Sequence, residues 1–115
     1  MTEYIVAFIT APSEDEAADM ARRLVDCRLA GCVNIVRGVR SIYRWEDKTQ
    51  DEAETLMIVK TRKDLFEPLM KRVKELHPFR VPEIIALPIL EGSADYLGWL
   101  SEVTREVTDD VPDHK

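Results

Sequence analysis

Two side chains in this sequence, Cys32 and His77, have the chemistry to bind a soft metal ion. A cysteine thiolate favours Cu(I), and an imidazole nitrogen binds copper or zinc. Neither side chain requires such a role, because free cysteines are usually small buried residues and a histidine can simply end a helix. For Cys32 the structural interpretation is the commoner one, whereas for His77 both stay open. Both are kept as candidate metal ligands.

Other polar and aromatic residues are weaker candidates. Carboxylates can bind hard cations, although most surface carboxylates are simply solvated. Those with this potential are Glu46, Asp47, Glu83 and Glu91. Tyr43 and Trp45 alternate in a segment of period two, which favours packing at a subunit contact over a ligand platform. Cys27 lies in the back half of a predicted helix, where a structural role is expected.

Motifs for catalysis are missing from the sequence. The four glycines are scattered and form neither a G-x-G-x-x-G nor a G-K-[ST] phosphate loop. With His77 and His114 as the only histidines, no zinc-hydrolase motif can be built, and no nucleophile elbow marks a serine hydrolase. We expect no enzymatic activity and no organic cofactor. A cysteine-dependent enzyme that uses Cys32 and His77 is the remaining catalytic alternative.

Composition indicates one globular domain. Apolar residues make up 45% of the 115 residues and charged residues 33%, which is enough for a packed core. The net charge of −6 disfavours nucleic acid and anionic membranes as partners. Neither a signal peptide nor a membrane span is expected, since the apolar run 84–90 is far shorter than the ~20 residues needed. Two cysteines in a C-x4-C spacing predict no disulfide framework, and therefore the cytoplasm.

Hydrophobic periodicity predicts four strands and three helices. We expect strands at 4–10, 32–46, 54–61 and 83–90, and helices at 13–31, 64–76 and 92–107. Ser13 and Glu16 predict a capping box at the first helix, and Gly31 a left-handed residue that ends it. Gly38 predicts a bulge, and the polar residues 47–51 predict a turn.

These elements in the order βαββαβ plus a terminal helix predict an α+β fold of the ferredoxin-like type. The two middle strands should pair as a long hairpin, and right-handed crossovers should place both internal helices on one face of the sheet. The other face then needs the terminal helix or another subunit as cover, so we expect an oligomer. Residues 1–107 should form the domain, and the acidic residues 108–115 a flexible tail.

Five segments resemble the CutA family of divalent-cation tolerance proteins, over about residues 3–107. They are Gly31-Cys32-Val33-Asn34-Ile35, Ser41-Ile42-Tyr43-Arg44-Trp45-Glu46, Ile58-Val59-Lys60-Thr61, His77-Pro78-Phe79-Arg80-Val81-Pro82-Glu83-Ile84 and Tyr96-Leu97-Gly98-Trp99. The resemblance implies a ferredoxin-like homotrimer in which the long hairpins exchange edge contacts between subunits. It also implies an association with tolerance of copper and other divalent cations, and no established enzymatic reaction.

The resemblance implies metal ligands that this chain carries only in part. Bacterial relatives have ligands at a cysteine late in the first strand and at the histidine of the His-Pro motif. His77 matches that histidine and Cys32 matches the cysteine of the Cys-Val-Asn stretch, whereas Ile9 or a neighbour stands at the strand-one position. The expected function is a trimeric divalent-cation tolerance protein that binds copper or another divalent ion. The alternative is a trimeric signalling or interaction module that binds a small molecule or partner protein at clefts between subunits.

Overall fold

Four strands and three α-helices follow one another in the predicted order within residues 3–107, the part of the chain that the computed structural model describes. The strands are β1 (Tyr4–Ala11), β2 (Cys32–Trp45), β3 (Lys48–Arg62) and β4 (Ile84–Pro88). The helices are α1 (Glu14–Asp26), α2 (Phe66–Leu76) and α3 (Ala94–Val103), and a 3-10 turn, η1 (Lys63–Leu65), precedes α2. The expected tail at 108–115 lies outside the described residues.

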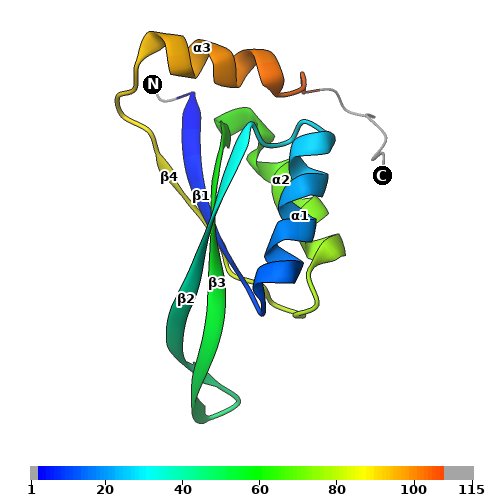
Figure 1. Cartoon of the computed structure of the whole chain (residues 1–115), viewed down its shortest axis with the longest axis vertical. Helices are drawn as coiled ribbons and strands as arrows, with labels where there is room; N and C mark the ends of the chain where they lie inside the picture. The colour runs from blue at the N-terminus through cyan, green and yellow to red at the C-terminus, as the bar shows by residue number, and fades with distance from the viewer. Residues whose placement is uncertain (1–2, 108–115) are drawn as a thin grey trace.

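The sheet has the strand order β2-β3-β1-β4, and every neighbouring pair is antiparallel. Both α1 and α2 pack against the same face of this sheet, as the sequence predicted (Figure 1). The core between them and the sheet is formed by alternate residues of β1 and β3 and by the inner faces of both helices. Its large, fully buried members include Ile9, Leu24, Met57, Val59, Leu69 and Val73. This arrangement is the ferredoxin-like α+β fold.

Local capping signals were predicted correctly at the start of α1 but not at its end. The Ser13 hydroxyl oxygen accepts the amide hydrogen of Glu16 at 3.2 Å. The Glu16 carboxylate accepts the Ser13 hydroxyl proton at 3.1 Å. Glu16 therefore bonds the hydroxyl of Ser13, whereas in a standard capping box it would bond the Ser13 backbone amide. The prediction that Gly31 ends the helix is wrong, because the left-handed residue is Arg28, with φ 65°. The amide of Arg28 bonds Val25 O, which turns the chain three residues before the glycine.

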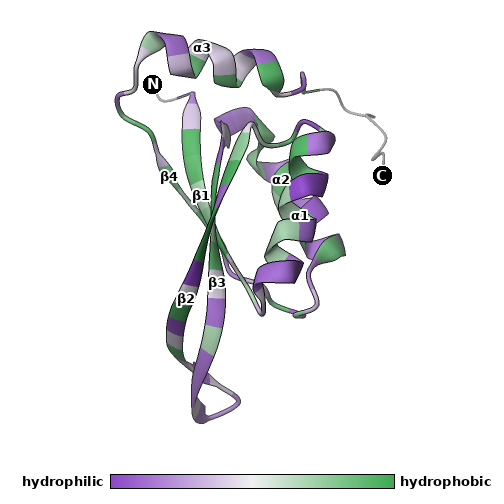
Figure 2. Cartoon of the chain, in the orientation of Figure 1, coloured by the Kyte–Doolittle hydropathy of each residue, from purple (hydrophilic) through white to green (hydrophobic). Residues whose placement is uncertain are grey.

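The hairpin between β2 and β3 is longer and tighter than predicted. Its turn consists of Glu46 and Asp47, whose φ values of 52° and 65° are those of a two-residue turn that matches strand twist. The expected turn at 47–51 and strand start at 54 are therefore wrong, since β3 begins at Lys48. Residues 48–52 are polar because this arm of the hairpin projects into solvent, and polarity alone does not exclude a strand (Figure 2).

The predicted bulge at Gly38 is confirmed. The register of β2 against β3 shifts between Val36 and Val39, and Gly38 has φ +76° within that shift. A side chain at this backbone conformation is strained, although a Cβ would meet no atom within 4 Å. The bulge therefore depends on the backbone freedom of glycine and on no packing restriction.

We expect Gly38→Ala to lower the free energy of unfolding by about 1 kcal/mol, because alanine disfavours positive φ. Urea unfolding followed by circular dichroism measures this difference. Gly38→Asn is the matched control, since asparagine tolerates the left-handed region better than alanine. An alanine variant as stable as the parent would show that the bulge can form without positive φ.

The face of the sheet opposite α1 and α2 is apolar and largely uncovered. Residues opposite one another in the register share a face, so Phe8 lies beside Ile58 on one side and Ile85 on the other. We call this surface the open face; it includes Val6, Phe8, Val36, Leu56, Ile58, Ile85 and Leu87. The side of β4 that faces away from β1 pairs with no other described strand, so β4 is an edge strand.

The terminal helix covers only one end of the open face. α3 crosses the sheet near the start of β1, where the Tyr4 hydroxyl bonds the Ser101 hydroxyl at 2.6 Å (Figure 1). A Cβ on Gly31 would lie 2.4 Å from Leu100 Cδ1, so the helix approaches the backbone closely here. α3 ends at Val103, so the prediction that this helix extends to residue 107 is wrong. Ile85 and Leu87 stay more than half exposed beyond the reach of the helix.

Candidate functional site

His77 ends α2 and is 7% exposed, with hydrogen bonds at both ring nitrogens. Its Nδ1 accepts the amide hydrogen of Phe79 at 3.1 Å, so this nitrogen carries no proton. The proton is then on Nε2, which donates to the carbonyl oxygen of Thr10 at 2.7 Å. The His77 and Phe79 rings also lie 5.0 Å apart. The imidazole thus ties the end of β1 to the segment after α2, and a metal ion would have to replace one of these bonds.

Cys32 starts β2 and is half-buried at the end of the open face, beneath α3. Its Sγ lies 4.0 Å from the side-chain oxygen of Asn34, which also accepts from the Lys60 ammonium. Burial raises the pKa of Tyr96 on α3, and the charge and hydrogen bond of Cys32 raise it further. Cys32 therefore lies in a small polar group with a tyrosine and an amide. Cys27 is also half-buried, and its Sγ donates to Leu24 O at 3.6 Å, in line with a structural role.

The structure does not bring Cys32 and His77 together. Cys32 is opposite Lys60, which is opposite Val6, whereas His77 is bonded to Thr10, four residues further along β1. Four residues of a strand correspond to about 13 Å. One metal ion, or one catalytic pair, cannot use both side chains of a single chain in this arrangement.

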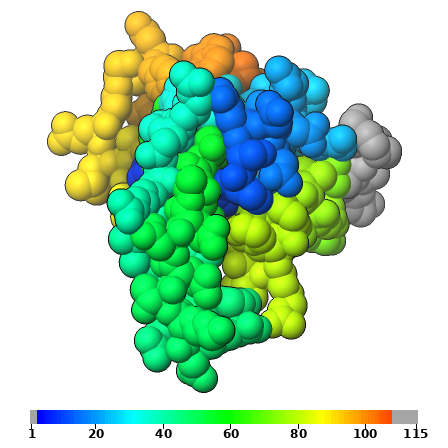
Figure 3. All heavy atoms as spheres, turned by 60° about the horizontal axis from the view of Figure 1, so that its bottom comes forward, coloured from blue at the N-terminus to red at the C-terminus, as the bar shows by residue number. Residues whose placement is uncertain are grey.

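A pocket of about 410 Å³ opens between the hairpin and the segment after α2; we call it the hairpin pocket. Tyr43 and Trp45 line it from β2, and Phe79 lines it from the segment 77–83. Figure 3 shows this segment, in yellow-green, reaching beside the green hairpin with a hollow between them. Two carboxylates, Glu54 and Glu83, also line the pocket, and no lining residue is cationic. The hairpin pocket is thus an aromatic hollow with negative charge.

The negative charge acts directly on the aromatic wall. Partial burial raises the pKa of the Tyr43 phenol, and the carboxylates of Glu52 and Glu54 raise it further because they disfavour a phenolate beside them. Glu54 is only 9% exposed, which is unusual for an acidic residue. It lies in β3 just before the apolar part of that strand. The sequence signalled Tyr43, Trp45 and Glu83 as candidates, but neither Glu54 nor Phe79.

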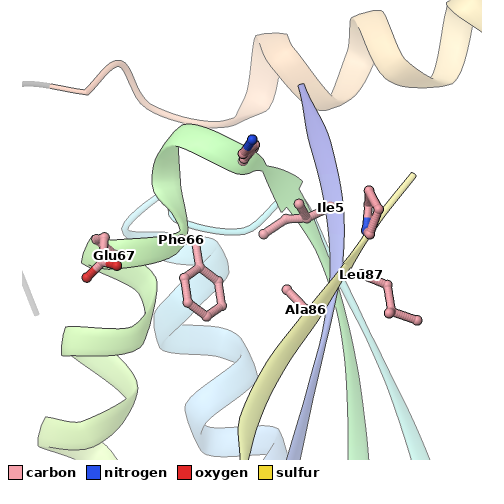
Figure 4. A pocket seen from close by; sticks show the side chains of 7 residues that line it. Ile5, Phe66, Glu67, Ala86 and Leu87 are labelled. Carbon is pink, nitrogen blue, oxygen red and sulfur yellow. The ribbon is translucent and has the colours of Figure 1, made fainter. Parts of the chain in front are cut away.

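A second hollow of about 530 Å³ lies along the edge of β4. Figure 4 shows Ile5, Phe66 and Ala86 directed toward one another from β1, α2 and β4, whereas Leu87 points away toward the open face. These three residues are apolar, and Lys63 and Glu67 also line the hollow. It lies beside the unpaired edge of the sheet.

The remaining carboxylate candidates are scattered. Glu46 and Asp47 form the exposed hairpin turn, and Glu91 is exposed after β4, so only Glu83 lines a pocket. Within residues 3–107, no group of three His, Cys, Asp or Glu side chains is placed to hold a metal ion. In the described part of one chain, the candidate metal ligands are therefore isolated from one another and form no complete metal site.

The chain matches a known family along almost all of its described length. The family "CutA1 divalent ion tolerance protein" matches residues 5–103. The chain is similar to the "Divalent-cation tolerance protein CutA" of Thermus thermophilus, with 54% identity over 99 residues that cover 86% of this chain and 96% of that protein. The chain belongs to the CutA1 family of divalent ion tolerance proteins. The resemblance noted from five sequence segments is thereby confirmed.

Solved CutA1 structures have the same fold as this chain. The crystal structure of CutA1 from Oryza sativa superposes with a TM-score of 0.89 at 44% identity, covering 92% of this chain and 97% of that one. "Protein CutA" of Homo sapiens is 42% identical over 105 residues, or 91% of this chain. This CutA1-family chain spans 59% of that human protein and 56% of the chloroplastic relative from Arabidopsis thaliana. No helix within residues 3–107 is both long and apolar enough to span a membrane.

Proposed function

We propose that this CutA1-family chain is a cytoplasmic homotrimer that acts in divalent-cation tolerance by binding copper or another divalent metal ion. Family membership supports the cation role, because the family and its Thermus relative are both described by divalent ion tolerance. That description names tolerance of an ion and no reaction, so the proposal includes no catalytic step.

The open face is the observation that supports the trimer. A sheet covered by helices on one side leaves apolar residues such as Phe8, Ile58 and Ile85 facing water on the other. α3 covers only the end near Tyr4. Contiguous exposed apolar surface of this kind marks an interaction surface. In the proposed assembly, sister chains bury the open face, and the unpaired edge of β4 receives the hairpin of a neighbour.

In this proposal, Cys32 and His77 supply the metal ligands. Cys32 is half-buried and offers a thiolate, which suits Cu(I). His77 offers its imidazole once the Phe79 amide has released Nδ1. Since the two side chains lie apart within one chain, a site that combines them draws them from different subunits. The second candidate function, a trimeric signalling module that binds a small molecule, is favoured by the hairpin pocket.

We expect Cys32→Ser to weaken Cu(I) binding by about tenfold or more, because loss of a thiolate removes the soft ligand. The measurement is a competitive Cu(I) titration of protein purified without an affinity tag, combined with metal analysis. Cys27→Ser is the matched control, since that thiol donates to a helix carbonyl in the same chain. His77→Ala should separately lower Cu(II) binding.

The outcomes assign or remove each ligand independently. Equal Cu(I) affinity of the Cys32 and Cys27 variants would remove Cys32 from the site. Unchanged Cu(II) binding in His77→Ala would leave His77 with only its bonds to Thr10 and Phe79. If no metal binds while a metabolite raises the melting temperature, the signalling module becomes the better description.

A further inference from the structure

The hairpin pocket has the chemistry of a cage for an organic cation. Tyr43, Trp45 and Phe79 present aromatic rings to it, and Glu54 and Glu83 present carboxylates. We propose that this pocket binds a small molecule through an alkylammonium or guanidinium group, with the rings around the cation and the two carboxylates balancing its charge. The side chains that would contact the cation differ from the proposed metal ligands Cys32 and His77.

Glu54 is the residue that most strongly indicates a cationic ligand. Glu54 as a whole residue is 9% exposed, and it lines the pocket. Among the residues 3–107, no side chain forms a hydrogen bond or an ion pair with the Glu54 carboxylate. No described cationic side chain is paired with this carboxylate, so a cation that enters the pocket would meet a carboxylate that is not already occupied. Hydrogen bonds between a cation and a carboxylate are about twice as strong as those between neutral groups.

The Phe79 side of the aromatic wall is held in place before any ligand arrives. His77 donates to the Thr10 carbonyl and accepts from the Phe79 amide, and both Thr10 and Phe79 line the pocket. Tyr43 and Trp45 lie on the opposite wall, in the outer part of the hairpin, where their register partners are Gln50 and Lys48. Preorganised walls reduce the entropy lost on binding. His77 is therefore a positioning residue for this pocket.

An organic cation fits the pocket better than a bare divalent ion. A hard divalent ion needs about six oxygen ligands around it, whereas aromatic faces attract ammonium and guanidinium groups within about 6 Å. The pocket places two carboxylates among three aromatic rings. Its volume of about 410 Å³ also exceeds that of a single ion and suits a small organic molecule.

Titration with butylammonium tests the proposal directly. In Trp99→Phe, Trp45 is the only tryptophan left of the two in the chain, so its fluorescence reports the pocket. Butylammonium chloride is titrated at constant ionic strength, beside 1-butanol as a neutral probe of the same length. We expect saturable binding of butylammonium, and binding of butanol weaker by at least about tenfold.

Charge-removing variants in the same background locate the binding site. Glu54→Gln and the more exposed Glu83→Gln should each weaken butylammonium binding by about tenfold, since each removes a charged partner. Glu91→Gln removes the same charge outside the pocket and should bind as the parent does. The proposal is overturned if butylammonium does not bind, if butanol binds equally well, or if the three glutamine variants behave alike.

Discussion

Replacement of Ile58 by glutamate is expected to reduce the molar mass of the assembly from three chains to one. Ile58 lies in the middle of the open face, opposite Phe8 on β1 and Asn34 on β2. Burying a carboxylate without a partner in an apolar contact costs several kcal/mol, and in the proposed symmetric trimer this cost would arise in all three subunits. Light scattering after size-exclusion chromatography measures the mass at micromolar concentration.

Val25→Glu is the matched control for this experiment. Val25 is 38% exposed near the end of α1, on the side of the sheet away from the open face. The same change of charge and size there should leave the mass of the assembly unaltered. A parent protein that is already monomeric, or an Ile58→Glu variant that remains trimeric, would contradict the proposal that sister chains cover this face.

Gly31→Ala is expected to lower the free energy of unfolding by about 1–3 kcal/mol, the range for overpacking a filled site. The added Cβ would lie 2.4 Å from Leu100 Cδ1 and 3.1 Å from Val103 Cγ2. Leu100 is fully buried, so its side chain has little room to move away. Denaturant unfolding at one fixed protein concentration keeps the contribution of assembly constant.

Gly98→Ala provides the comparison within the same helix. A Cβ on Gly98 would meet no atom within 4 Å, and the residue lies inside α3. Alanine there should raise the free energy of unfolding by about 0.5–1 kcal/mol through helix propensity. If both alanine variants change stability in the same direction, close approach of α3 to Gly31 is not what restricts that position.

Local signals in the sequence predicted local structure well. The Ser13 cap and the bulge at Gly38 each depend on a few neighbouring residues. The role of Gly31 was predicted wrongly because a glycine can be required at a position for two different structural reasons. It could end a helix, but it is required here by contact with Leu100, nearly seventy positions further along the chain. Such a contact leaves no local pattern.

The candidate site was predictable only in part for the same reason. Tyr43 and Trp45 stood out by their alternation in one strand, although the expected role there was packing at a subunit contact. Glu54 joins them because the shifted register beyond the bulge sets it opposite Val39, and Phe79 joins because His77 ties its segment to Thr10. Neither relation can be obtained from spacing along the chain. His77 was a candidate ligand with a structural role left open, and its two hydrogen bonds became visible only with the fold.

The outer half of the hairpin has a consequence for how a newly made chain matures. Between Val39 and Glu54, β2 and β3 pair only with each other, since β1 meets β3 from Thr55 onward. A two-stranded ribbon alone is marginally stable in water. In the proposed trimer, this arm therefore acquires its final rigidity from its neighbours. Ordering of the arm and assembly of the subunits then form one cooperative step. Until that step, the hairpin arm of a monomeric chain frays and is sensitive to proteases.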